Sequence, residues 1–200
     1  MDFLETLASR NAEFAQSGFS ADLKMMPSRK TMIIGCVDPR VDPMDVLKLA
    51  PGETAVIRNV GGRVNPALLE TMALLGAVSR AAGQPVGDGW NLVLLHHTDC
   101  GINGCYHHAP KLLSKYMGVA DDKLDDLAIT DPYKAVAIDV EALRANPNLP
   151  GGFTVTGLVY DVKTGRIETV VPPSRCGPNR VKVIRYDEGA AMRHRTRKAE

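Results

Sequence analysis

Short apolar runs alternate along this chain with longer segments whose apolar residues recur every three or four positions. Short apolar runs bounded by turn residues are typical of buried strands, and the longer spacing is typical of amphipathic helices. On this basis we predict strands at Thr31–Cys36, Thr54–Arg58, Trp90–His97, Phe153–Val162 and Arg166–Val171. The last two flank Lys163-Thr164-Gly165, which is typical of a hairpin turn.

The helical spacing marks a second set of segments. The predicted helices are Asp2–Gln16, Pro43–Leu49, Asn65–Ala82, Asn103–Met117 and Asp131–Ala145. Three of them begin with an Asp or Asn followed by proline, a pair that suits the cap and the first position of a helix.

The order of these elements predicts an α/β fold. Strands that alternate with helices indicate a mostly parallel central β-sheet with helices on both faces, and the hairpin predicts an antiparallel edge. We expect a single α/β domain over residues 1–172, which includes the N-terminal helix. Residues 173–200 form a basic, Pro-containing C-terminal tail. Ligands of such sheets bind beyond the carboxyl ends of the strands, where Cys36 and His97 are predicted to lie.

Composition and charge exclude several classes of protein. The net charge is +1, which gives no reason to expect a nucleic-acid partner or a membrane surface. No apolar run approaches the roughly 20 residues of a membrane span. The N-terminal segment is acidic and amphipathic, unlike a signal peptide. Without a secretory signal, the 4 cysteines are expected to stay reduced, so we predict a cytoplasmic protein.

Two motifs carry the chemistry of the chain, Gly35-Cys36-Val37-Asp38-Pro39-Arg40 and His97-Thr98-Asp99-Cys100-Gly101. Two cysteines and one histidine form a ligand set suited to Zn²⁺, and a site with three protein ligands leaves a position open for catalysis. His96 is the rival of His97, but strand alternation turns it to the opposite face. The carboxylate of Asp38 and the guanidinium of Arg40 can pair through two parallel hydrogen bonds, which would keep Asp38 ionised.

The order and spacing of these motifs resemble the β-class carbonic anhydrases. That family usually carries a Pro-Gly-Glu turn and an Arg-Asn segment between the two motifs, here Pro51-Gly52-Glu53 and Arg58-Asn59-Val60-Gly61-Gly62. The resemblance runs from Thr31 to Lys115, with a weaker match at Phe153–Asp161. The residues of these motifs are most similar to those of a short, divergent branch of the family. That branch also includes carbonyl sulfide and carbon disulfide hydrolases.

The resemblance implies a role for each residue of the two motifs. Cys36, His97 and Cys100 would bind Zn²⁺, and the enzyme would hydrate carbon dioxide reversibly to bicarbonate through a zinc hydroxide. Asp38 would accept a hydrogen bond from that hydroxide while Arg40 holds the carboxylate. In some members of the family the aspartate becomes a fourth zinc ligand at low pH.

The resemblance also implies a substrate pocket lined by Val60 and the backbone N–H of Gly101. Two positions depart from the plant-type pattern, because Ala50 replaces a glutamine and Ala55 replaces an aromatic residue. Ile33 stands where some members carry the tryptophan of an inhibitory bicarbonate pocket. Because of these changes, the sequence indicates the zinc ligands more clearly than it indicates the substrate.

Three functions therefore remain open. The first is hydration of carbon dioxide, the second is hydrolysis of carbonyl sulfide or carbon disulfide on the same zinc site, and the third is a non-catalytic zinc-binding protein. The family resemblance further implies a homodimer or a dimer of dimers, with a small-molecule substrate and neither nucleic acid nor membrane as partner.

Overall fold

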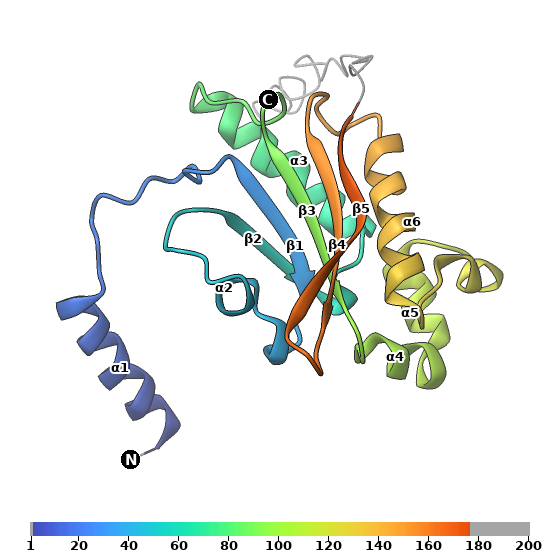
Figure 1. Cartoon of the computed structure of the whole chain (residues 1–200), viewed down its shortest axis with the longest axis horizontal. Coiled ribbons are helices and arrows are strands. Elements are labelled where there is room, and N and C mark those ends of the chain that lie inside the picture. The colour runs from blue at the N-terminus through green and yellow to red at the C-terminus, as the bar shows by residue number, and fades with distance from the viewer. Residues whose placement is uncertain (1, 177–200) are drawn as a thin grey trace, which may run out of the picture.

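The computed structural model describes residues 2–176 (Figure 1). The predicted tail from residue 177 onward lies outside the described residues. The strands are β1 (Thr31–Cys36), β2 (Ala55–Asn59), β3 (Asn91–His97), β4 (Thr154–Asp161) and β5 (Arg166–Arg175). The α-helices are α1 (Phe3–Ser17), α2 (Pro43–Val46), α3 (Pro66–Ala81), α4 (Ile102–His108), α5 (Pro110–Met117) and α6 (Pro132–Ala145). None of the helices described is long and apolar enough to cross a bilayer.

The five strands form one sheet in the order β2-β1-β3-β4-β5. The first four strands are parallel, and β5 pairs with β4 in the antiparallel direction. The predicted α/β class, with its mostly parallel sheet and antiparallel edge, is confirmed. Asn65, Asp42 and Asp131 cap α3, α2 and α6 with their side chains, as their sequence context indicates.

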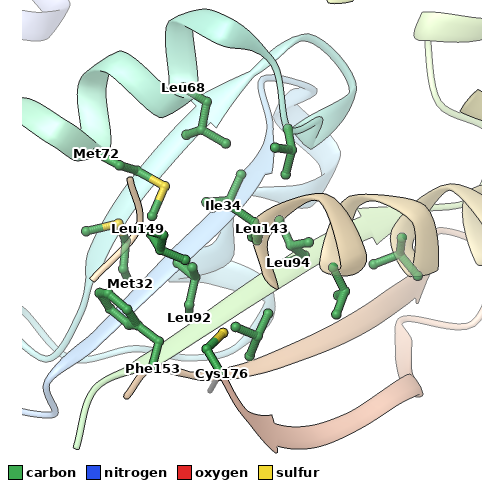
Figure 2. Packing of buried hydrophobic residues seen from close by; sticks show 14 of the residues in the cluster. Met32, Ile34, Leu68, Met72, Leu92, Leu94, Leu143, Leu149, Phe153 and Cys176 are labelled. Carbon is green, nitrogen blue, oxygen red and sulfur yellow. The ribbon is translucent and has the colours of Figure 1, made fainter. Parts of the chain in front are cut away.

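The main core lies between the sheet and the pair α3 and α6 (Figure 2). Alternate residues of the central strands point into it and are fully buried, including Ile34, Leu92, Leu94 and Val155. The opposite face of the sheet is covered less completely. Pro43 at the start of α2 packs there against Gly35, while Val93 and Leu158 stay half-buried. This difference explains the strict buried and half-buried alternation along β4.

The predicted helix Asn103–Met117 is wrong as a single element. The structure has two helices, α4 and α5, which are separated at Ala109. Ala109 has φ −144° and ψ 50°, outside the helical region. Pro110 follows it, lacks a backbone N–H and disfavours the helical conformation of the residue before it. The chain therefore turns at this pair, and α5 begins at the proline.

Strand β5 ends at Arg175, four residues beyond the predicted end at Val171. Pro172 and Pro173 therefore lie inside the strand and do not end it. β5 has only β4 as a neighbour, so an N–H that faces away from the sheet is not needed for pairing, and prolines are tolerated on such an edge. The register between β4 and β5 is irregular near Gly157, opposite this segment.

A buried ion pair ties the segment after β2 to α6. Arg63 donates from Nε to Asp139 Oδ2 at 2.7 Å and from Nη2 to Oδ1 at 3.1 Å. Both side chains are almost completely buried. His96 Nε2 also lies 3.3 Å from Asp139 Oδ2, although without the geometry of a hydrogen bond. Burial opposes the charge of Asp139, but His96 and Arg63 more than offset it and lower the pKa of the carboxyl.

We expect Asp139→Ala to lower the free energy of unfolding by about 3–5 kcal/mol, because it leaves the Arg63 charge buried without its partner. The matched control is Asp126→Ala, which removes an exposed carboxylate paired with Lys123 and should change stability by less than about 1 kcal/mol. Urea unfolding followed by circular dichroism measures both values. Equal effects of the two substitutions would contradict a structural role for the buried pair.

Candidate metal centre

Cys36, His97 and Cys100 meet at the carboxyl edge of the sheet. Cys36 ends β1 and His97 ends β3, and the parallel pairing of these two strands places both ends at the same edge. Cys100 follows in the loop that leads to α4. One ligand atom from each residue lies within 4.8 Å of the others, and the two Sγ atoms are 3.8 Å apart.

The close approach of the connecting segments requires glycine. Gly62 follows β2 with φ +65°, and a Cβ there would lie 3.0 Å from the backbone carbon of Gly35, the residue before Cys36. A side chain at this position would strain the backbone and push against the end of β1. The Gly61-Gly62 turn therefore allows the segment after β2 to lie directly against the candidate ligands.

The donor set fits a zinc ion. The Nε2 atom of His97 is buried and makes no hydrogen bond, while Nδ1 lies 2.9 Å from the carbonyl oxygen of Thr98. A second interaction on the far ring nitrogen is typical of metal-binding histidines, because it fixes the ring and leaves the other nitrogen for the metal. With two sulfur atoms beside it, Nε2 completes a set of three ligands with an open fourth position.

The electrostatics of the cluster favour a cation. The hydrogen bond from the Cys100 thiol lowers the pKa of Cys36 to about 4 in spite of burial. The same hydrogen bond, together with burial, raises the pKa of Cys100. Burial of the His97 ring opposes its charge, but the Cys36 thiolate more than offsets this and raises the pKa of His97. A divalent cation would bind the two sulfurs as thiolates and the imidazole in its neutral form, and it would displace their protons.

Asp38 and Arg40 lie beside the cluster and are paired. Arg40 Nη2 donates to Asp38 Oδ2 at 2.7 Å, and Nε donates to Oδ1 at 3.1 Å. These hydrogen bonds lower the pKa of Asp38 to about 2. The two side chains pair as the motif indicates, and a tight turn brings them together. Asp38 caps the short 3₁₀ turn Pro39–Val41 and also accepts from the backbone N–H of Arg40 at 2.9 Å.

Asp99 extends this pair, and the sequence did not reveal its role. Arg40 Nη1 donates to Asp99 Oδ2 at 2.8 Å, and Nη2 donates to the carbonyl oxygen of Asp99 at 2.9 Å. Asp99 has φ +54°, a left-handed conformation that aspartate tolerates better than most residues. Arg40 thus connects the segment after Cys36 to the loop between His97 and Cys100. The position of Asp99 between two candidate ligands was the only available signal.

Arg58 is the second residue whose role the sequence did not reveal. Its Nε donates to the carbonyl oxygen of Cys36 and its Nη2 to that of Asp38, each at 2.8 Å. Its Nη1 pairs with Asp42. One guanidinium therefore holds the backbone on both sides of Val37. The Arg-Asn segment was visible as part of the resemblance, but nothing in its sequence indicated these contacts.

The remaining predicted site residues are Val60 and Gly101. Val60 is 38% exposed, and its carbonyl oxygen accepts from the Tyr116 hydroxyl at 3.2 Å. Gly101 precedes α4 and is exposed. The two are brought near each other because the turn after Val60 packs against Ile102, which follows Gly101. His96 faces away toward Asp139, as the alternation of the strand predicts.

The other two cysteines do not join the cluster. Cys105 packs against the small apolar group around Ile102 and Leu113, and Cys176 lies in the main core. All four cysteines are free thiols. Cys105 therefore offers a natural comparison for substitutions at the candidate ligands.

Comparison with known proteins identifies relatives along most of the chain. A sequence-family model described as "Carbonic anhydrase" matches residues 31–167. The chain is 27% identical over 173 residues to Beta-carbonic anhydrase 1 of Mycobacterium tuberculosis, an alignment of 86% of this chain and 100% of that protein. It is 24% identical over 193 residues to the carbon disulfide hydrolase of Acidianus sp., an alignment of 84% of this chain and 85% of that protein.

A solved structure agrees with these relatives. The crystal structure of carbonic anhydrase from Streptococcus mutans superposes with a TM-score of 0.66 at 28% sequence identity. The superposition covers 85% of this chain and 98% of that one. Residues 31–167, which the family model matches, contain both motifs.

Proposed function

The chain belongs to the β-class carbonic anhydrase family, and from that premise we propose that it catalyses the reversible hydration of carbon dioxide to bicarbonate. The observation that supports this proposal most directly is the set Cys36, His97 and Cys100 beside the paired Asp38 and Arg40. A zinc-binding protein without catalysis would have no use for that pair, which argues against the third function considered above.

Each residue of the site has a defined part in this proposal. Cys36 and Cys100 would hold Zn²⁺ as thiolates and His97 through Nε2. A zinc ion bound in this way lowers the pKa of a water molecule on it to about 7 and so supplies a nucleophile at neutral pH. Asp38, which the Arg40 hydrogen bonds keep ionised, would accept a hydrogen bond from the attacking nucleophile and orient it toward the substrate.

The protein side of the substrate pocket is also a proposal. The Val60 side chain is partly exposed and would offer an apolar wall to a small linear molecule. The backbone N–H of Gly101, directly after the last ligand, would donate to an oxygen of the substrate. No side chain of Gly101 obstructs that approach, and a Cβ there would meet no neighbouring atom.

Hydrolysis of carbonyl sulfide or carbon disulfide is the second candidate. It is favoured by the similarity to the carbon disulfide hydrolase of Acidianus sp. over most of the chain. Ala50 adds to this reading, because it lacks the hydrogen-bond donor that glutamine supplies at this position in the plant-type pattern. The same nucleophile would attack the carbon atom of either substrate.

One experiment separates these functions. Stopped-flow measurement of carbon dioxide hydration is run beside an assay of hydrogen sulfide release from carbonyl sulfide, on the same zinc-loaded preparation. Rapid hydration with slow release of sulfide supports the first proposal, and the reverse supports the second. Zinc-loaded protein that is inactive in both assays would contradict an enzymatic function on this site.

We expect the rate of hydration to rise with pH through one transition at or somewhat above the pH of about 7 set by a zinc-bound water. The carboxyl of Asp38 has its pKa lowered to about 2, so it is ionised at every pH above about 4 and contributes no step near neutrality. The negative charge of two thiolate ligands should hold the transition at or above that of an all-histidine site. The rate of hydration measured as a function of pH gives the position of this transition.

The shape of the profile distinguishes two behaviours of Asp38. A one-proton curve means that Asp38 stays paired with Arg40, and a steeper rise means that it moves onto the metal at low pH. A rate that is flat between about pH 6 and pH 9 would contradict both, because neither group would then control the reaction.

A homodimer, or a dimer of dimers, is also part of the proposal. None of the 15 residues of α1 is buried, and Phe3, Leu4, Leu7 and Phe14 are exposed. Figure 1 shows α1 standing apart from the sheet and its helices. An amphipathic helix that buries no apolar residue in its own chain gains little stability alone, so a second copy would supply the missing surface.

We expect Leu4→Glu together with Leu7→Glu to convert the protein to a monomer, because two charges would be placed on the apolar face of α1. Glu13→Lys changes the charge of the same helix without changing its apolar residues and should leave the dimer intact. Sedimentation velocity at micromolar concentration measures the result. A stable and active monomer of the unmodified chain would contradict this part of the proposal.

A further inference from the structure

A small pocket lies between the loop of candidate ligands and the start of α6. Its volume is about 130 Å³, and its walls include Arg63, His96, Asn103, Thr130 and Ala135. Asp38 and Arg40 do not line it. A water molecule occupies about 30 Å³ in the liquid, so the pocket can hold a molecule a few times larger than water but no nucleotide or sugar.

Apart from His97 Nε2, which belongs to the candidate ligand cluster, three residues that line this pocket carry buried polar atoms without a hydrogen-bond partner. These atoms are Nη1 of Arg63, Nε2 of His96 and Oδ1 of Asn103. Arg63 is only 1% exposed, and its other nitrogens are engaged by Asp139 and by the carbonyl oxygen of Leu127. A buried polar group without a partner destabilises the folded state, and most such groups in proteins have one. A ligand in this pocket would therefore be favoured if it formed hydrogen bonds with these atoms.

The hydrogen-bonding capacity of these atoms indicates which kind of ligand would bind. Arg63 Nη1 carries N–H donors only, so the group that faces it must be an acceptor. The carboxylate of Asp139 already accepts from Arg63 and from the backbone N–H of Val64. The carboxylate of Asp99, which also borders the pocket, accepts from Arg40. Hydrogen bonds between a guanidinium and an anionic oxygen are stronger than those to neutral oxygen, which favours an anion over water.

We propose that this pocket binds a small planar oxyanion, with one oxygen on Nη1 of Arg63 and another polar atom near Oδ1 of Asn103. Bicarbonate matches this arrangement, because it offers acceptor oxygens to Arg63 and one O–H donor to Asn103. The identification of bicarbonate as the natural ligand rests on the proposed function. The anion site itself rests only on the pocket and its unpartnered atoms.

The pocket also touches the candidate metal centre. His97 and Cys100 contribute to its walls, although the ligand atoms of these residues face the cluster on Cys36. A bound oxyanion would connect this loop to Arg63 and, through Asp139, to α6. Binding should therefore stabilise the folded protein by mass action, in proportion to the concentration of the anion.

The test compares thermal unfolding of the zinc-loaded protein in sodium nitrate, sodium bicarbonate and sodium gluconate at equal ionic strength. Nitrate is planar and unreactive, and gluconate is too large for the pocket. At ten times the dissociation constant, nitrate or bicarbonate should raise the melting temperature by about 3–6 °C relative to gluconate.

Ala135→Leu places a larger side chain into the pocket without changing Arg63, and it should remove this increment. Ala142→Leu is the matched control, because Ala142 is exposed on the same helix and away from the pocket. Asn103→Leu tests the opposite wall in case the first variant fails to fold. Zinc content is measured in each variant, so that loss of the metal is not mistaken for loss of the anion.

The proposal would be overturned if nitrate or bicarbonate still raised the melting temperature of both pocket variants. It would also be overturned if neither anion raised the melting temperature of the unmodified protein. Crystals grown in nitrate that show only water against Arg63 Nη1 would overturn it as well. A protein that does not hydrate carbon dioxide but keeps the pocket-dependent increment would contradict the proposed function and leave the anion site standing. Normal hydration with no increment would contradict the anion site alone.

Discussion

Cys36→Ser and Cys100→Ser are each expected to remove the bound zinc and to reduce activity by more than about 100-fold, beyond the loss typical of a group that only supports a ligand. Each change replaces a thiolate by a hydroxyl that does not ionise at neutral pH, so two protein ligands remain. Elemental analysis of the purified protein should show about one zinc per chain before the substitution and little after it.

The chain provides its own control for this experiment. Cys105→Ser makes the same chemical change in a cysteine that packs beside Ile102 and lies outside the ligand cluster. It should keep both the metal and most of the activity. Full activity in protein without zinc, or equal zinc loss in all three variants, would contradict the assignment of the ligands.

Asp38→Ala and Arg40→Ala are each expected to reduce activity by about 100-fold or more while the zinc content stays unchanged. Asp38 is not one of the three ligands, so its removal leaves the metal site complete. Arg40 holds both oxygens of Asp38, and without it the carboxylate would lose its orientation. The double variant should therefore be little slower than either single variant, since the two residues act as one unit.

Two comparisons sharpen this test. Arg40→Lys keeps the charge but cannot donate two parallel hydrogen bonds, so it should lose much of the activity as well. Asp45→Ala removes an exposed carboxylate from the nearby α2 and should change little. Additive losses in the double variant, or activity that survives in Asp38→Ala, would show that the pair does not work as proposed.

Much of the fold follows from local patterns in the sequence. The buried strands β1 and β3 are visible as apolar runs, and the helix starts at Asn65 and Asp131 are visible as a cap followed by proline. These signals depend only on residues a few positions apart, which is why they could be read without a structure. Pro110 is also a local signal, because proline disfavours the helical conformation of the residue before it, and it marks the break at Ala109.

The strand predicted at Arg166–Val171 was too short for a different reason. Pro172 and Pro173 are poor strand residues in the interior of a sheet, and only the position of β5 at the edge makes them acceptable. No local pattern shows that a strand lies at an edge. The order of the strands, which is a property of the whole sheet, decides it.

The candidate site also has some features that depend on local sequence and others that depend on the tertiary structure. The sequence by itself determined the candidate ligands, the places of Cys36 and His97 at the ends of two strands and the pairing of Asp38 with Arg40, because these depend on short motifs and on strand periodicity. Only the tertiary structure decided which distant groups complete the site. The ion pair of Arg63 and Asp139 joins residues 76 positions apart, and the Arg58 contact with Cys36 spans 22. Contacts of this range depend on how the strands pair and how the helices pack on them, and no spacing along the chain encodes that directly.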